Sequence, residues 1–442
     1  MKKNMIVMAA LLLAGQCTWA QKLWTLDECI DYAMQNNITL KKARLSAESA
    51  QEDVKGAKGA QLPTLSASTN QSVGYRPWQD NGTTTVTNGQ VNTKVNKSYY
   101  NGSYGLNASW TVWNANKKTN TVRLNKLSAE QAKLESQVTA NSIQEQIAQL
   151  YVQILYLTEA VSVSEKSLET SMKNEERGKE MLAVGTMSKA DVAQLSAQRA
   201  SDEYTIVESR ANISKYKLQL KQLLELDGTA EFDIAIPDSL DDQAFAEIPS
   251  LQSVYEQATV KRPEIASKML AVKSSELNVK IAKAGYYPTL NMTGGLGTST
   301  NSLSNNTWGK QFKTNFDASA GLSLSIPIFD GRQTKTSVSK ARIQQQQALL
   351  DWQYQQKQLY QTIEQYWLDA ETNLQKYRTA QVTEQSELQS YELLQEQFQL
   401  GLKNIVELMS GKDKLLAAQQ NKLQSKYQTI LAQQMLKFYA GQ

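Results

Sequence analysis

One uninterrupted helix-forming stretch, residues 332–400, limits what this chain can fold into more than any other feature. It contains neither proline nor glycine, and as a helix it would be roughly 100 Å long, too long for a compact domain. Apolar residues recur in it at alternating steps of four and three, the spacing of a supercoiled seam: Ile363, Trp367, Ala370, Leu374, Tyr377, Leu388, Tyr391 and Phe398. The polar residues Gln381 and Glu384 interrupt the seam, so the predicted coiled coil is imperfect.

A tight turn and a second helix follow this rod. Gly401 suits the positive φ at which helices commonly end, and Asn404 with Glu407 matches a capping box, which starts a helix. The second helix is expected from Ile405 to Phe438. Together the two helices predict a long antiparallel hairpin that turns at Gly401.

The hairpin occurs twice in the sequence. A shift of 216 residues carries Gly185 onto Gly401 and relates further pairs of like residues: Asn114 and Asp330, Ile147 and Ile363, Tyr151 and Trp367, Ser188 and Asn404, and Asp191 and Glu407. The first copy also keeps the seam, with a polar interruption at Ser164, through Ile143, Ile147, Leu150, Ile154, Leu157, Val161 and Leu168. Such a duplication predicts two copies of one structural unit.

The duplication extends upstream with a changed offset. Pro63-Thr64-Leu65 matches Pro288-Thr289-Leu290 at a spacing of 225 residues. Because 225 exceeds 216 by nine, the first copy holds nine extra residues. They fall between Pro63 and Gly105, where the Gly/Asn/Thr-rich stretch 81–101 lies.

After Pro63 and Pro288 the apolar period changes to two, which is typical of a strand with two different faces. The two prolines are therefore expected at the starts of strands. Four strands are predicted, at about 64–76, 99–113, 289–299 and 314–328. Each copy then runs as helix, strand, polar loop, strand, long helix, turn and helix.

Shorter helices precede the strands. Thr25 and Glu28 form a capping box for a helix that pauses at Asn36-Asn37 and runs to about Gly56. Ser250 opens the corresponding helix of the second copy, and Pro263 marks its pause.

These patterns divide the chain into a first repeat, 21–226, a linker, 227–249, and a second repeat, 250–442. The linker carries seven acidic and no basic residues. We interpret it as solvated surface, which is the usual state of such a charge run.

Residues 1–20 have the pattern of a secretory signal peptide. Lys2-Lys3 precedes an apolar stretch that is too short to span a membrane, and Ala20 provides a small residue before cleavage at Gln21. Acylation of Cys17 is an alternative, although Gln16 stands where lipoprotein processing prefers a small residue. No later segment has the pattern of a transmembrane helix, so any membrane crossing falls to the strands.

Composition excludes several classes of function. At 41% hydrophobic residues and a mean hydropathy of −0.48, the chain is polar for one large globule. Its net charge of +4 is spread along the helices, without the basic patch of a nucleic-acid-binding protein. There is no histidine, and after signal cleavage only Cys29 of the two cysteines remains. We therefore expect no enzyme, no cofactor and no metal site.

The strand pattern predicts a shared barrel. Strands of about ten residues span a bilayer when tilted, and alternating rows suit lipid on one face and water on the other. The same alternation describes a soluble, half-buried sheet, but the export signal and the rod-length helices favour the membrane. Open edges are not tolerated in hydrocarbon, so four strands require partner chains. We predict an α+β membrane protein, in which three chains form a twelve-stranded β-barrel continued by a helical coiled-coil tunnel.

The whole mature chain resembles the TolC family of outer-membrane efflux channels. The resemblance rests on the order of the duplicated parts, the Tyr287-Pro288-Thr289-Leu290 segment, and the Val184-Gly185 and Leu400-Gly401 turns. The segment 401–408, Gly-Leu-Lys-Asn-Ile-Val-Glu-Leu, is similar to the family's tip motif. The resemblance implies a homotrimer in the outer membrane of a Gram-negative bacterium, with its helices in the periplasm.

The resemblance also implies partners. They are outer-membrane lipid, a periplasmic adaptor (membrane fusion) protein and an inner-membrane pump of the RND or ABC type. The expected function is a passive duct, gated at the helical tip, in a tripartite efflux or type I secretion system. The sequence does not select the exported substrate or the cognate pump.

Five residues are implied as periplasmic gate candidates. Glu407 matches the first of two acidic residues that ring the family's constriction, whereas Ser410 occupies the second acidic position. Asp191, Lys403 and Phe398 match positions of polar links that hold the tip closed, although Phe398 lacks the hydroxyl of a tyrosine used in the family. The plainer alternatives are that Glu407 only caps its helix and that Lys403 is a solvated tip residue.

Aromatic residues on the strands are candidates for interfacial girdles: Tyr104, Trp110, Phe316 and, less clearly, Trp113. Tyr99-Tyr100 and Trp308 flank the polar loops and are candidates for the outer rim.

A pore-less alternative is a secreted trimeric coiled-coil fibre or adhesin. It shares the signal peptide and the heptads, but it does not explain why strand pairs occur at matching places in both repeats. A fibre would wash off cells with salt or urea, whereas a barrel would need detergent.

Overall fold

The computed structural model describes residues 23–78, 83–87, 90–94, 97–228, 231–237, 244–302, 304 and 306–441. The predicted signal peptide and Cys17 lie outside the described residues. The chain divides into two compact units. The first consists of Met1–Leu45, Leu134–Ala266 and Gln353–Gln442, and the second of Ser46–Lys133 and Ser267–Trp352. Each unit takes segments from both sequence repeats, so the compact units do not follow the repeat boundary.

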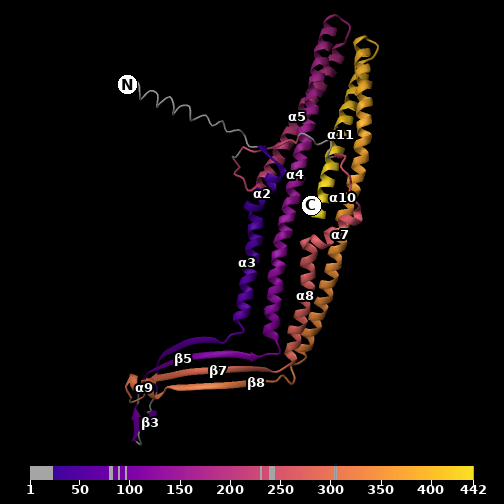
Figure 1. The fold of residues 1–442 in the computed structure, drawn as a ribbon. Helices are drawn as coiled ribbons and strands as arrows, with labels where there is room; N and C mark the ends of the chain where they lie inside the picture. The colour runs from indigo at the N-terminus through magenta and orange to yellow at the C-terminus, as the bar shows by residue number, and fades with distance from the viewer. Residues whose placement is uncertain are drawn as a thin grey trace, which may run out of the picture. The chain divides into compact units, whose positions relative to one another are not determined.

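Four long helices form two antiparallel hairpins (Figure 1). α4 (Lys117–Ala183) and α10 (Gln333–Gln399) each have 67 residues, and α5 (Lys189–Leu224) and α11 (Ile405–Ala440) each have 36. The equal lengths show that the duplication holds in the structure. At about 1.5 Å per residue, α4 and α10 are each roughly 100 Å long. Among the described residues, no helix combines the length and the apolar character that a membrane crossing needs.

The shorter helices begin and end at the expected signals. α2 (Leu26–Asn36) starts at the Thr25 capping box, and α3 (Ile38–Gly59) continues three residues beyond the predicted end near Gly56. α7 (Leu251–Lys261) starts at Ser250, and α8 (Pro263–Lys283) leads into a short 3-10 helix, η1 (Ala284–Tyr286).

The core of the first unit follows the predicted seam. Ile147 and Ile154 of α4 are fully buried and lie in one apolar cluster with the seam residue Tyr377 of α10, which gives the two hairpins an apolar contact. Glu384, which interrupts the seam, forms an ion pair with Lys422 of α11, with Lys422 Nζ 2.9 Å from Glu384 Oε2. The interruption therefore carries a specific polar contact between the two helices of one hairpin.

The acidic linker differs from the prediction of a solvated segment. Phe232 and Ile234 are buried, and β6 (Asp233–Ile234) pairs in parallel with β1 (Leu23–Trp24). The hydroxyl of Tyr151 donates to the carbonyl of Ala235 at 2.6 Å. Apolar side chains between the acidic ones thus fix this part of the linker to the first unit, while residues 229–230 and 238–243 of the linker lie outside the described residues.

The second unit is built on a four-stranded antiparallel sheet in the order β2-β5-β7-β8 (Figure 1). Its strands are β2 (Thr64–Tyr75), β5 (Ser98–Trp113), β7 (Thr289–Asn301) and β8 (Asp317–Ser325). β8 is shorter than the predicted 314–328. Thr314 belongs to a helix, α9 (Trp308–Thr314), and Pro327 lacks the N–H that would continue a ladder.

The pairing register gives the sheet one apolar and one polar face. Leu106 lies between Ala67 on β2 and Leu296 on β7, and Leu296 in turn faces Ala318 on β8. The neighbouring row is polar, with Asn107 between Ser66 and Gly295. Among the described strands, β2 pairs only with β5 and β8 only with β7, so both outer edges of the sheet are unpaired.

Two elements in the polar loops were not predicted. The loop after β2 contains a hairpin of β3 (Thr83–Thr87) and β4 (Gln90–Lys94), and the loop after β7 contains α9. β3 and α9 lie at the end of the sheet opposite α3 and α8 (Figure 1).

The connections from strand to long helix are alike in the two copies. Ala115 and Asn116 have φ of 52° and 61°, and their counterparts Gly331 and Arg332 have 61° and 70°. Before each pair, a side chain accepts a backbone N–H of the first helical turn, at Asn114 and at Asp330. The repeat is therefore preserved in the backbone conformation as well as in the residue types.

Candidate functional site at the hairpin tips

The two tips turn through the same backbone motif. Gly185 has a φ of +77° and Gly401 one of +72°, a conformation that side chains other than glycine rarely adopt. In each turn the next N–H reaches back to a carbonyl of the last helical turn, Thr186 to Met181 and Leu402 to Gln397, both at 2.9 Å. These bonds satisfy carbonyl groups that the helix end leaves free.

Both acidic gate candidates complete capping boxes. The backbone N–H of Ser188 donates to the Asp191 carboxylate at 3.3 Å, and the backbone N–H of Asn404 donates to the Glu407 carboxylate at 3.3 Å. The capping interpretation of Glu407 therefore describes its contacts within one chain.

Lys403 and Glu407 form an ion pair at the second tip. Lys403 Nζ lies 2.6 Å from Glu407 Oε1, and both side chains are more than a third exposed. The hydrogen bond from Lys403, helped by the Asn404 N–H, holds the pKa of Glu407 below its ordinary value. Within the chain Lys403 thus contacts Glu407, and the contact with Asp191 across neighbouring hairpins stays a prediction.

Phe398 has an apolar role in this structure. It is buried in a cluster that takes Leu195 from α5 together with residues of α10 and α11: Tyr391, Ile405, Leu408 and Leu415. The cluster joins the first hairpin to the second just below the tips.

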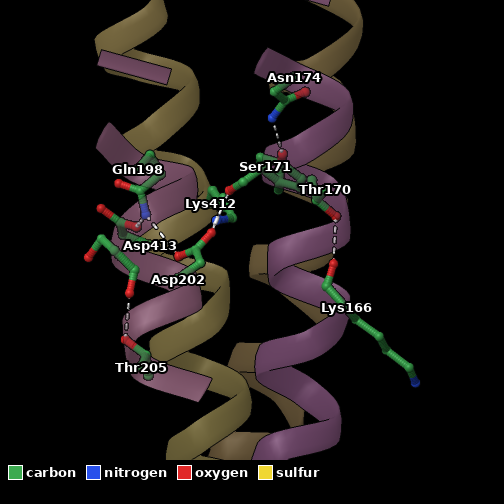
Figure 2. A network of polar contacts seen from close by, with 11 residues as sticks. Lys166, Thr170, Ser171, Asn174, Gln198, Asp202, Thr205, Lys412 and Asp413 are labelled. Atoms are coloured by element: carbon green, nitrogen blue, oxygen red, sulfur yellow. Dashed lines mark hydrogen bonds and ion pairs between the residues drawn. The ribbon is translucent and has the colours of Figure 1, made fainter. Parts of the chain in front are cut away.

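A buried polar network, which we call the lock, also joins the two hairpins (Figure 2). It consists of Ser171 on α4, Asp202 on α5 and Lys412 on α11, all at least 94% buried. The ammonium of Lys412 contacts the Asp202 carboxylate and donates to Ser171 Oγ at 2.5 Å, and Ser171 in turn donates to Asp202 at 2.5 Å. A charge pair withdrawn from water in this way is costly to break from one side.

Neutral side chains make further polar contacts around the lock. Gln198 donates to Asp202 at 3.2 Å and to Asp413 at 3.3 Å, and Asn174 donates to the Tyr391 hydroxyl at 3.4 Å. Burial raises the pKa of Tyr391, so it stays a neutral acceptor. Taken together, the lock and these neighbouring bonds draw side chains from all four long helices.

The lock was not predicted, although the sequence contains a signal for it. Lys412 stands four residues after Leu408 and three before Leu415, which is a seam position. Asp202 stands seven residues after Leu195 and four before Ile206, which is a seam position too. A charged residue at a seam position needs a buried partner.

Exposed apolar residues surround the turns. Val184, Leu400, Leu402 and Val406 are each between 61% and 75% exposed. Ser410 is also exposed, and it lines a groove of about 660 Å³ with Gln194 of α5. A cluster of three or more histidine, cysteine or acidic residues able to hold a metal is absent from the part of the chain that the structure describes.

Comparisons with known proteins agree with this architecture. The family model of the outer membrane efflux protein matches residues 29–225 and 254–442. The outer membrane efflux protein BepC of Brucella suis is 24% identical over 97% of this chain and 88% of its own length. The outer membrane protein TolC of Vibrio cholerae is 21% identical over 97% of this chain and 92% of its own.

A solved structure shows the same fold. The outer membrane channel CmeC of Campylobacter jejuni superposes with a TM-score of 0.76 at 19% identity, covering 97% of this chain and 91% of that one. The family match takes in both repeats and both tips. This chain therefore belongs to the outer membrane efflux protein family, and it is a protein of the Gram-negative outer membrane.

Proposed function

We propose that three copies of this chain form a passive duct through the outer membrane, with the long helices continuing the pore into the periplasm. The observation that carries the proposal is the four-stranded sheet with two unpaired edges and two chemically different faces. An unpaired edge in hydrocarbon leaves backbone groups without partners, at several kcal/mol each. Neighbouring copies supply those partners.

The strand directions support closure. β2 and β8 are the outer strands of a fully antiparallel sheet of four, so they run in opposite directions. β8 of one copy can therefore pair antiparallel with β2 of the next, and three copies give twelve strands. The apolar row then faces lipid and the polar row faces water. A pore-less fibre gives no reason for either face.

The tips supply the gate and the docking surface in this proposal. Glu407 and Lys403 from three chains form a ring around the periplasmic end, and the lock holds the two hairpins of each chain together. The exposed apolar residues of both turns are the contact for a periplasmic adaptor protein, which links the duct to an inner-membrane pump. The energy of transport comes from that pump, because a duct itself only provides a water-filled path.

The test is made on protein extracted from the outer membrane. Native mass spectrometry should give three chains per particle, and the same material should form conducting pores in planar bilayers. Material that washes off with urea, or that runs as a single chain without conductance, would refute the duct. A photo-crosslinker at Leu402 should capture an adaptor in cells, and capture at the distant, exposed Lys335 position should be absent.

A further inference from the structure

The helix α9 is fixed firmly to β7 at the loop end of the sheet. The buried side chain of Gln311 accepts the Asn301 N–H at 2.8 Å and donates to the carbonyls of Asn301 and Asn306 at 3.0 and 2.7 Å. Thr298 Oγ1 donates to the Phe312 carbonyl at 2.7 Å. Seven residues would not form a stable helix alone, so these bonds hold α9 in place.

α9 lies on the apolar face of the sheet. Thr298 faces Tyr104 in the ladder, and Tyr104 stands two residues from Leu106 in the apolar row. The rings of Trp308 and Phe312 stack with their centroids 5.3 Å apart, and the ring of Phe312 packs on that of Tyr104 with their centroids 5.5 Å apart. Trp308 is 56% exposed. These three aromatic residues therefore continue the lipid face where the aliphatic side chains end, which is the usual place of an interfacial girdle.

Two lysines lie on the opposite side of α9. At about 100° per residue, Lys310 and Lys313 each lie about 150° around the helix from the midpoint between Gln311 and Phe312, the two residues that hold α9 against the sheet. Both are exposed, and among the described residues neither forms an ion pair. A charge that points outward from the lipid face is tolerated only at the level of the headgroups. α9 thus has an aromatic side against the sheet and a cationic side toward the surrounding leaflet.

We propose that α9 binds a phosphate-bearing glycolipid of the outer leaflet, with Lys310 and Lys313 contacting its phosphates and Trp308 contacting its acyl region. The proposal rests on the proposed function, because that function puts the helices in the periplasm and the strand loops on the exterior side. The corresponding loop of the first repeat contains β3 and β4 instead. One trimer therefore carries three such sites.

The experiment measures lipid binding to the purified trimer by native mass spectrometry, with bisphosphorylated lipid A as the probe. The variant is Lys310→Ala with Lys313→Ala. The matched control is Lys335→Ala with Lys340→Ala, which removes two exposed lysines from α10. A second arm uses lipid A from which both phosphates have been removed.

Each lysine near an anionic surface contributes roughly fivefold in affinity, so the variant should bind lipid A about 25-fold more weakly. This loss of affinity should be smaller at high salt, because salt screens the charges. The control should bind as the unchanged protein does. Equal binding by variant and control, or equal binding of lipid A and its dephosphorylated form to the unchanged trimer, would overturn the proposal. The proposed duct is tested independently of lipid binding. The same mass spectra show whether the particle contains three chains or one, and bilayer conductance is recorded on the same samples.

Discussion

At the scale of single residues, the buried ion pair of the lock holds the two hairpins of one chain together. Lys412 and Asp202 are withdrawn from water, so each needs the other. Replacing only Lys412, as in Lys412→Met, leaves a buried carboxylate without its cation and should cost about 3–5 kcal/mol of unfolding free energy. Lys414→Met, at an exposed position on the same helix, should cost little. Denaturant titration of the purified protein measures both.

The double variant Lys412→Met with Asp202→Leu separates the charge from the packing. Replacing both members of a buried pair by apolar side chains is often neutral or stabilising. We therefore expect the double variant to recover most of the lost stability. If it were as unstable as Lys412→Met alone, packing rather than the uncompensated charge would explain the loss.

The Lys403–Glu407 pair sets the charge of the proposed constriction. At neutral pH the negative charges of three glutamates and the positive charges of three lysines cancel. Because the pKa of Glu407 is lowered, acidification ends this cancellation only when the pH falls through that lowered pKa. Lys403→Ala should leave a ring of three carboxylates, which repel one another and titrate at higher pH. Reversal potentials should then show stronger cation selectivity for this variant, fading on acidification. Unchanged selectivity would remove Glu407 from the constriction.

At the scale of elements, each hairpin packs a leucine of one helix against a glycine of the other, and the two hairpins place the glycine on opposite helices. A Cβ at Gly178 would lie 2.5 Å from Leu195 Cδ1, and a Cβ at Gly411 would lie 2.6 Å from Leu394 Cδ1. In the 216-residue register Gly178 corresponds to Leu394, and Leu195 to Gly411. The duplication has therefore exchanged the small and the large partner between the two helices of the hairpin.

This exchange predicts a compensating pair of substitutions. Gly411→Leu should force Leu394 out of place and cost about 1–3 kcal/mol of unfolding free energy. Adding Leu394→Ala should restore much of that stability, because it reopens the space. A double-mutant cycle measures the coupling. If the changes in unfolding free energy of the two single substitutions simply added, the side chains at 394 and 411 would not be competing for the same space.

The sequence predicted the elements whose signals are local. The long helices follow from the absence of proline and glycine over 332–400, and the four strands follow from period two after Pro63 and Pro288. α9 and the β3–β4 hairpin lie in short polar stretches without a periodic pattern, so they were missed. The pairing of β1 with β6, two residues each, depends on tertiary contacts around Tyr151 that no local pattern encodes.

The site was predictable in its turns but not in its contacts. Gly185, Gly401 and the two capping boxes have fixed spacings along the chain. Lys412 and Asp202 are 210 residues apart, and only the fold shows that they meet. Phe398 was assigned both to the apolar seam and to a missing hydrogen bond at the tip, and only its burial among Leu195, Tyr391 and Leu408 shows which of the two describes it.

At the scale of the whole molecule, the central claim is that one chain supplies too few strands for a closed barrel and completes it with identical neighbours. A disulfide across the predicted β8–β2 junction tests this most directly. In a Cys29→Ser background, Ser66→Cys on β2 is combined in turn with Ser319→Cys, Ser323→Cys and Ser325→Cys on β8. Oxidation in intact outer membranes should convert one of these combinations into a covalent trimer on denaturing gels, with each single variant uncrosslinked. A band no larger than one chain in every combination, with the sheet closed within its own chain, would contradict the account.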